Sequence, residues 1–347
     1  MIVEIGDRPV IASALPDETA FFSTVSPEGP PPPYRRLGSL AALWRALNDP
    51  AVSLIVCHPT FSAPWSLRHL SRALFARRAL KGRVPLLRAF GPQLLRFTGR
   101  APVVVLDFED LPVINTNTLF LLDRCQLFFK RELPADHWRV FLKTAHANLP
   151  TPRFRNLPRQ RARIAKLAPL SLGLPLDWAS VPEAPSQERT SDVFFAGRIE
   201  GSSSLRARGL AELRALAAQG LRIDLPDAPL PREAFYRRCA GAWLVWSPEG
   251  FGWECFRHYE ALASGTVPLI NQPSIERHQP LIAGEHALYY DVEPGGLTGA
   301  VNAALADKAR LTRIAMAGRA HVLGHHTPAA IARHVVAMAS NSETRAG

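Results

Sequence analysis

Hydrophobic residues in the first half of the chain gather in short runs separated by polar segments. The runs Val52–Cys57, Pro102–Leu106 and Gln126–Phe129 have the length and composition of buried strands. In Pro64–Leu80, Leu67, Leu70 and Leu74 line one face, which is typical of an amphipathic helix. This alternation of strands and helices predicts a parallel α/β sheet.

The second half of the chain repeats the alternation. Its predicted strands are Val193–Ala196, Leu221–Asp224, Ala242–Trp246, Val267–Ile270 and Leu288–Tyr290. Its predicted helices are Leu205–Gln219, Pro231–Cys239, Leu297–Leu305, Ala309–Leu323 and Pro328–Met338. We therefore expect two domains, residues 1–175 and 192–340, joined by a polar, proline-bearing linker at 176–191 and followed by a disordered tail at 341–347.

Composition is that of a globular protein, since 347 residues with 47% hydrophobic content are ample for a sizeable core. No apolar run approaches the roughly 18 residues that a membrane-spanning helix needs. The N-terminal sequence MIVEIGDRP does not have the order of a secretory signal. The four cysteines, Cys57, Cys125, Cys239 and Cys255, form no C-x-x-C pair. We expect reduced, mostly buried thiols in a cytoplasmic protein.

Charge is distributed unevenly along the chain. Residues 1–175 hold 24 basic and 12 acidic side chains, a net of +12, whereas residues 176–347 hold 17 and 18, a net of −1. Arg68–Arg100 contains nine basic residues, among them Arg72 and Arg78, and no acidic one. One interpretation is that this span binds anionic phospholipid or a lipid-linked acceptor. The alternative is that it is a solubilising surface. A nucleic-acid partner is disfavoured because no stacking pattern or known motif accompanies the charge.

A glycine-rich segment follows the strand at 242–246. Gly250 and Gly252 permit a tight loop with close backbone approach to a ligand. The pattern turns helical over Glu254–Ser264, and Gly265 stands where a helix-ending glycine belongs. The free N–H groups and the dipole of this helix face the loop, so the segment predicts an anion-binding site.

Two side chains of that helix suit a phosphorylated sugar ligand. Arg257, in the first turn, offers a planar fork for phosphate. Glu260, one turn later, offers a carboxylate that could accept hydrogen bonds from two sugar hydroxyls.

The segment resembles the C-terminal domain of GT-B glycosyltransferases, and most closely the bacterial family 1-like group and its exostosin-like relatives. The shared pattern F-R-x-Y-E-A-L-x-x-G-x-x-P is matched by Phe256, Arg257, Tyr259, Glu260, Ala261, Leu262, Gly265 and Pro268. The resemblance implies two Rossmann-like domains facing a cleft. It also implies that Glu260 holds the nucleotide ribose and that the loop and Arg257 hold the diphosphate.

The acidic residues before Glu260 depart from the family pattern. Many members carry two glutamates separated by seven residues, whereas here ten residues separate Glu249 from Glu260 and five separate Glu254 from it. Either glutamate could contact the donor sugar. Arg198, just after the strand at 193–196, matches the position from which a basic residue reaches the donor phosphates in this family, and Arg206 is a second candidate.

Catalytic candidates lie in the first half, beyond the ends of predicted strands, where open α/β sheets bind ligands. Asp107, Glu109 and Asp110 follow one strand, and His58 follows another. We favour Asp110 as the base that deprotonates the acceptor hydroxyl, with His58 as its rival. A retaining enzyme would need neither in that role.

We thus expect a glycosyltransferase that moves a sugar from a nucleotide-sugar donor to a hydroxyl acceptor in bacterial cell-surface glycan or glycolipid synthesis. No metal and no cofactor beyond the nucleotide sugar are expected. Domain 1–175 would bind the acceptor and domain 192–340 the donor, at the cytoplasmic face of the inner membrane. The alternatives are a nucleotide-sugar epimerase of the same fold and a non-enzymatic scaffold with a degenerate nucleotide site.

Overall fold

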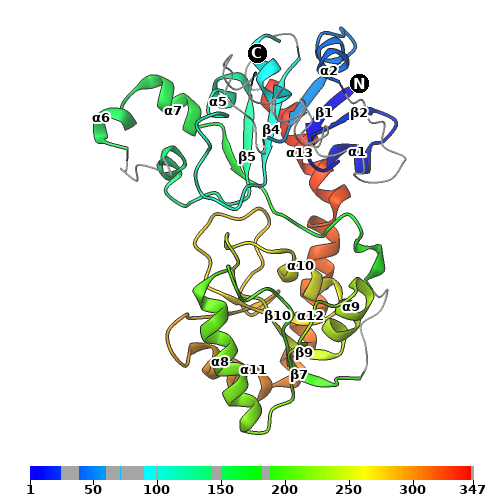
Figure 1. The fold of residues 1–347 in the computed structure, drawn as a ribbon, viewed down its shortest axis with the longest axis vertical. Helices are drawn as coiled ribbons and strands as arrows, with labels where there is room; N and C mark the ends of the chain where they lie inside the picture. Colours follow the sequence, from blue (N-terminus) through cyan, green and yellow to red (C-terminus); the bar gives the residue numbers. More distant parts are fainter. Residues whose placement is uncertain are drawn as a thin grey trace. The chain divides into compact units, whose positions relative to one another are not determined.

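The computed structural model describes residues 1–24, 39–59, 71, 90–98, 101–142, 150–181 and 188–344. The chain divides into two compact units, Met1–Leu170 with Ile331–Gly347, and Ser171–Ala330. Each unit contains one parallel sheet with helices (Figure 1), so the predicted α/β class is confirmed. The predicted helix at 64–80, with Arg68, Arg72 and Arg78, lies outside the described residues.

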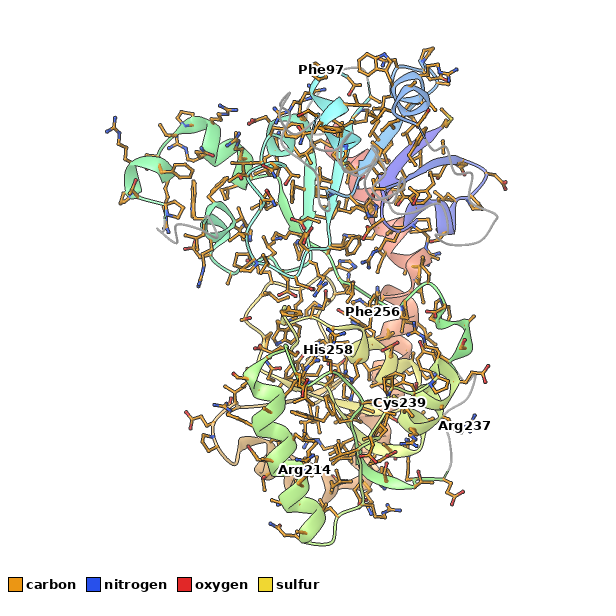
Figure 2. The ribbon with its side chains drawn as sticks, viewed as in Figure 1. Phe97, Arg214, Arg237, Cys239, Phe256 and His258 are labelled. Atoms are coloured by element: carbon orange, nitrogen blue, oxygen red, sulfur yellow. The ribbon has the colours of Figure 1, made fainter. Side chains whose placement is uncertain are left out.

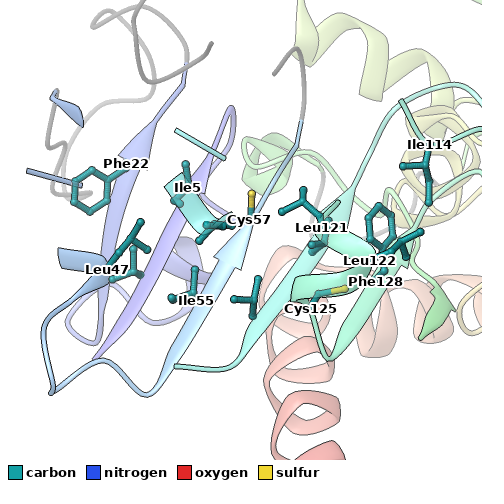
Figure 3. Packing of buried hydrophobic residues seen from close by; sticks show 14 of the residues in the cluster. Ile5, Phe22, Leu47, Ile55, Cys57, Ile114, Leu121, Leu122, Cys125 and Phe128 are labelled. Atoms are coloured by element: carbon teal, nitrogen blue, oxygen red, sulfur yellow. The ribbon is translucent and has the colours of Figure 1, made fainter. Parts of the chain in front are cut away.

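The first sheet has six parallel strands in the described part of its unit, in the order β2-β1-β3-β4-β5-β6. They are β1 (Ile2–Gly6), β2 (Thr19–Ser23), β3 (Leu54–Cys57), β4 (Val103–Asp107), β5 (Leu127–Lys130) and β6 (Leu167–Pro169). β1, β3 and β4 are buried throughout, and their sequences are apolar except for Glu4 in β1 and Asp107 at the end of β4. Ile5, Cys57, Cys125 and Phe128 are part of the core of this unit (Figure 3).

Short helices and turns accompany these strands. They are α1 (Ile11–Ala14), α2 (Leu40–Leu47), α5 (Leu121–Arg124), α6 (Pro152–Arg155), α7 (Pro158–Ile164) and the 3-10 turns Pro92–Arg96 and His137–Phe141. The predicted N-cap of α2 is confirmed, because the Ser39 hydroxyl accepts a hydrogen bond from the Ala42 amide at 3.1 Å.

The second sheet has five parallel strands among the described residues, in the order β11-β10-β9-β7-β8. They are β7 (Ser191–Phe194), β8 (Ile223–Asp224), β9 (Ala242–Trp246), β10 (Val267–Asn271) and β11 (Leu288–Tyr290). The helices are α8 (Ser204–Ala218), α9 (Arg232–Ala240), α10 (Phe256–Ala263), α11 (Gly296–Leu305) and α12 (Lys308–His325). The chain leaves β7 toward β8 and returns to β9 on its other side. The carboxyl ends of β7 and β9 therefore form a switch point, where such sheets bind ligands.

The last helix, α13 (Pro328–Thr344), does not follow the predicted domain division. From Ile331 onward it is grouped with the first unit. There His334 packs its ring 5.7 Å from that of Phe129, and Gln126 donates a hydrogen bond to the carbonyl of Ala339 at 3.2 Å. Residues 341–344 continue the helix, where the sequence predicted a disordered tail.

Ser171–Ser191, which contains the whole predicted linker, is grouped with the second unit as far as the structure describes it. Leu172 and Leu174 are buried there, and the Leu174 amide donates to the carbonyl of His326 at 2.8 Å. No helix in the described ranges combines the length and hydrophobicity needed to cross a bilayer.

Candidate active site

The predicted strand, glycine loop and helix are present at the end of β9. The Gly250 amide donates to the Gly252 carbonyl at 2.9 Å and so closes a tight turn. Cys255 is the N-cap residue of α10, which begins with Phe256 (Figure 2). Gly265 ends the helix with a φ of 76°, a left-handed conformation that favours glycine.

Arg257 is oriented by the loop that follows β7. Its Nε and Nη2 donate to the carbonyl of Ala196 at 3.2 and 2.7 Å, and its guanidinium lies 4.9 Å from the centre of the Phe195 ring. Its Nη1 is buried and has no hydrogen-bond partner among the described groups. A buried cationic donor without a hydrogen-bond partner is costly.

Glu260 lies one helical turn after Arg257 and is buried. Its Oε1 accepts hydrogen bonds from Arg232 Nη1 at 2.8 Å and from the Tyr236 hydroxyl at 3.2 Å. Burial raises the pKa of the Glu260 carboxyl, and Arg232 and Tyr236 offset part of this rise. Arg232 and Tyr236 belong to α9 and were not predicted as site residues, because only the fold brings α9 against α10.

Arg232, Arg257 and Glu260 line one open cavity of about 980 Å³. The cavity lies beyond the carboxyl ends of β7 and β8 and against the first turn of α10. Its polar groups include Arg198, Arg232, Arg257 and Glu260; its apolar groups include Pro226, Ala228, Leu230 and Phe235. An apolar wall for a base, a carboxylate for ribose hydroxyls and cations for a diphosphate are the features of a nucleotide site. We call it the donor cavity.

Glu249 lines a second hollow, of about 600 Å³, with Asn271. Its Oε2 accepts from Asn271 Nδ2 at 3.1 Å and its Oε1 from the Ser203 hydroxyl at 3.2 Å. Arg206 connects this loop to the one after β7, because it donates to the carbonyls of Glu249 and Arg198, each at 2.9 Å. Arg206 therefore positions the loops.

Glu254 is engaged inside the unit and is absent from the donor-cavity lining. Its exposed fraction is 3%. One carboxylate oxygen accepts from the Leu172 amide at 2.8 Å, and the other accepts from the Tyr259 hydroxyl. The predicted donor-binding residue Gly252 is also buried. Arg198, another predicted donor-binding residue, is exposed and lines the donor cavity.

The two predicted catalytic residues lie in the first unit. His58 is fully buried, with Nε2 3.0 Å from Oε1 of Glu4. The Glu4 carboxylate also accepts hydrogen bonds from three backbone amides at the start of α1, those of Val10, Ile11 and Ala12. His58 and Glu4 thus form a buried pair that the sequence did not indicate.

Asp110 is 48% exposed and forms an ion pair with Arg131 at 2.5 Å. Its neighbour Asp107 is buried against Lys130, whose Nζ is 3.0 Å from Oδ2. Burial raises the pKa of the Glu109 carboxyl, and Asp107 adds to the rise. Of the three acidic residues in this turn, Asp107 is the one that is buried and paired with a buried lysine.

Residues 248–337 match the glycosyl transferase-like family, and this stretch contains the glycine loop and α10. In three dimensions the chain is similar to sucrose-phosphate synthase from Thermosynechococcus elongatus, at 13% identity over 100% of both chains with a TM-score of 0.55. It is similar to HepE from Anabaena in complex with UDP, at 12% identity over 98% of this chain and 99% of that chain with a TM-score of 0.56. No curated protein matches the chain in sequence.

The chain has the fold of these GT-B glycosyltransferases, and its residues 248–337 match the glycosyl transferase-like family. The predicted GT-B fold is confirmed over the whole chain by the structural similarity. The predicted resemblance of the glycine-loop segment is confirmed by the family match over residues 248–337.

Proposed function

We propose that the chain transfers a sugar from a nucleoside-diphosphate sugar to a hydroxyl acceptor, and that the second unit binds the donor. The observation that carries this proposal is the pair Arg257 and Glu260. The two line the same cavity one helical turn apart, and Arg257 keeps one buried donor unpaired. HepE is described in complex with UDP and with UDP-glucose, which supports a uridine nucleotide as the first donor to test.

Departure of the nucleoside diphosphate leaves negative charge at the start of α10. Arg257, Arg198 and the N–H groups of the helix N-terminus would stabilise this charge, and because they are fixed in advance they need little reorganisation. We propose that these groups carry the charge without a metal. Activity should therefore survive EDTA. Loss on chelation, restored by manganese or magnesium, would instead favour Asp107, Glu109 and Asp110 as metal ligands.

The first unit would bind the acceptor. If the enzyme inverts, Asp110 is the favoured base, because its carboxylate reaches solvent whereas His58 is fully buried. Asp110→Asn should then lower kcat with little change in donor affinity. A fully active Asp110→Asn enzyme would remove Asp110 from this role.

We further propose a role in bacterial cell-surface glycan or glycolipid synthesis, with peripheral association at the inner face of an anionic membrane. The charge of residues 1–175 supports it. In the tract at 153–166, Arg155 pairs with Asp136, while Arg159 and Arg163 share Asp123. Two carboxylates thus offset two of the six positive charges of this tract. Co-sedimentation with anionic and neutral liposomes, repeated with Arg68, Arg72 and Arg78 changed to Glu, tests it; equal pelleting by both chains would refute it.

Calorimetry with UDP and UDP-glucose, followed by turnover assays with and without a hydroxyl acceptor, tests the main proposal. We expect binding, and release of free UDP that depends on the acceptor. Isomerisation of the nucleotide sugar would identify an epimerase instead. Binding without any turnover would identify a scaffold, and absence of binding would refute the donor site.

A further inference from the structure

Cys255 differs from the other three cysteines in its location. It is the N-cap residue of α10, it is only partly buried, and it lines the donor cavity. Cys57, Cys125 and Cys239 are buried. Burial raises the pKa of each of these three thiols. Cys255 is therefore the thiol that combines access to a cavity with a charged environment.

His258 and Ser247 complete a polar cluster around the Cys255 sulfur. The sulfur lies 3.6 Å from Nδ1 and 3.8 Å from Nε2 of His258, and 3.5 Å from the Ser247 hydroxyl. Nδ1 of His258 is 2.7 Å from that hydroxyl, and Nε2 is 3.1 Å from the carbonyl of Trp253. Each ring nitrogen thus lies within hydrogen-bond distance of an oxygen, which fixes the imidazole beside the sulfur.

The surroundings favour the thiolate. Burial by itself raises the pKa of the Cys255 thiol, but His258, Arg257 and Ser247 outweigh burial and lower the pKa to about 5. The N-terminus of α10 acts in the same direction, because its dipole favours negative charge. At neutral pH this cysteine is then mainly ionised, whereas an ordinary thiol with a pKa of about 8.5 is only a few per cent ionised.

We propose that Cys255 is a nucleophilic thiolate whose reaction with a low-molecular-weight disulfide closes the donor cavity, so that nucleotide binding depends on the redox state. In the reaction Sγ attacks one sulfur of the disulfide. A new S–S bond forms, the old one breaks, and the other half leaves as a thiolate that takes a proton from water. Excess thiol reverses the reaction by the same exchange. The closure part of this inference rests on the proposed donor site.

The position of the adduct explains why it would exclude a nucleotide. Cys255 and Arg257 line the same cavity, at the first turn of α10. A group attached to the sulfur would occupy the space where the diphosphate would meet the helix N-terminus. An anionic adduct, such as that left by glutathione disulfide, would also attract the unpaired Nη1 of Arg257.

The pH profile, rather than the absolute rate, identifies this thiolate. Lowering a thiol pKa increases the ionised fraction but weakens its nucleophilicity, with a Brønsted coefficient of about 0.4–0.5. For the lowered pKa of Cys255, the gain in ionised fraction and the loss of nucleophilicity nearly cancel at neutral pH. Below neutral pH the two reaction rates differ, because an ordinary thiol loses roughly tenfold in rate per pH unit while Cys255 stays ionised.

The first measurement is alkylation of the native full chain by iodoacetamide, mapped by peptide mass spectrometry. Cys255 should react at a nearly constant rate between about pH 6 and pH 8. The buried cysteines serve as internal controls that react only after denaturation. A rate at Cys255 that rises tenfold per pH unit would overturn the proposal, as would no reaction. This measurement does not depend on nucleotide binding.

The second measurement is calorimetry with UDP after treatment with glutathione disulfide. The adduct should weaken UDP binding at least tenfold, excess thiol should restore it, and bound UDP should slow the labelling of Cys255. The Cys255→Ser chain should show no effect of the disulfide. An adduct that binds UDP as well as the reduced chain would overturn the closure. If the reduced chain fails to bind UDP, the proposed donor site has failed, and the pH profile still decides on the thiolate.

Discussion

Gly197 and Arg257 are in direct contact at the donor cavity, although sixty positions separate them in sequence. A Cβ added to Gly197 would lie 2.4 Å from Nη2 of Arg257, closer than any real Cβ contact. The absence of a side chain at 197 is what allows Arg257 to reach the carbonyl of Ala196. This contact connects the loop after β7 to the first turn of α10.

Gly197→Ala should therefore displace Arg257 and weaken UDP binding about tenfold, the cost of roughly one charged hydrogen bond. Combined with Arg257→Ala it should add nothing further, because both changes remove the same interaction. Calorimetry of the single and double variants checks this. Additive losses would mean that Gly197 acts independently of Arg257.

Gly299→Ala is the matched control. Gly299 lies within α11, and a Cβ there would meet no atom within 4 Å. The change should leave UDP affinity unaltered and stabilise the fold by about 0.5–1 kcal/mol, because alanine loses less backbone entropy in a helix.

Arg257→Lys should weaken UDP binding at least tenfold even though the charge is retained. The single ammonium of lysine cannot reproduce the planar fork by which Nε and Nη2 of Arg257 both donate to the Ala196 carbonyl. Arg214→Lys, at an exposed position on α8 (Figure 2), should have no effect. Equal affinities for the Arg257→Lys and unmodified chains would remove the diphosphate role of Arg257.

Glu260→Gln and Glu254→Gln should have opposite consequences. Glu260 lines the cavity, so its change should reduce UDP affinity about tenfold through the loss of a charged acceptor. Glu254 accepts from Leu172 and Tyr259 in the interior, so its change should lower the free energy of unfolding by about 1–3 kcal/mol and leave affinity nearly unchanged. Thermal melts measure the stability of the two variants and calorimetry measures their UDP affinity. A loss of affinity in Glu254→Gln, with a loss of stability alone in Glu260→Gln, would assign the donor contact to Glu254.

Acid should destabilise the second unit through His326. Burial lowers the pKa of this histidine to about 3, and His321, His278 and His325 add to the shift. Since the unfolded chain takes up the proton at an ordinary pKa of about 6.5, the stability contributed by neutral His326 is complete above that value and falls as the pH drops toward 3. Between pH 6.5 and pH 5 the loss is about 2 kcal/mol.

Urea midpoints from pH 7 to pH 5 measure this loss. His326→Gln should flatten the profile, because glutamine can still donate to the carbonyl of Gln279 but does not titrate. His325→Gln, at an exposed neighbouring position, should keep most of the profile, because His325 makes the smallest contribution to the lowered pKa of His326. Identical slopes for all three chains would assign the acid sensitivity to other groups.

Features that depend on residues close together in the chain could be predicted before the structure was known. Apolar runs of strand length, helical periodicity and the glycines around α10 predicted both parallel sheets and the loop and helix after β9, because each signal lies within one element. Arg257 and Glu260 were predictable for the same reason, since their spacing places both on one face of one helix.

Contacts between side chains of different elements could be identified in the folded chain but not in the sequence. Glu249, Glu254 and Glu260 have the same side chain, yet Glu254 is buried by Leu172 and Tyr259 while Glu260 faces the cavity beside Arg232. The fit of Gly197 to Arg257 and the polar cluster around Cys255 likewise join different segments. These contacts depend on how helices pack against a twisted sheet, and a local pattern of polar and apolar residues does not encode that packing.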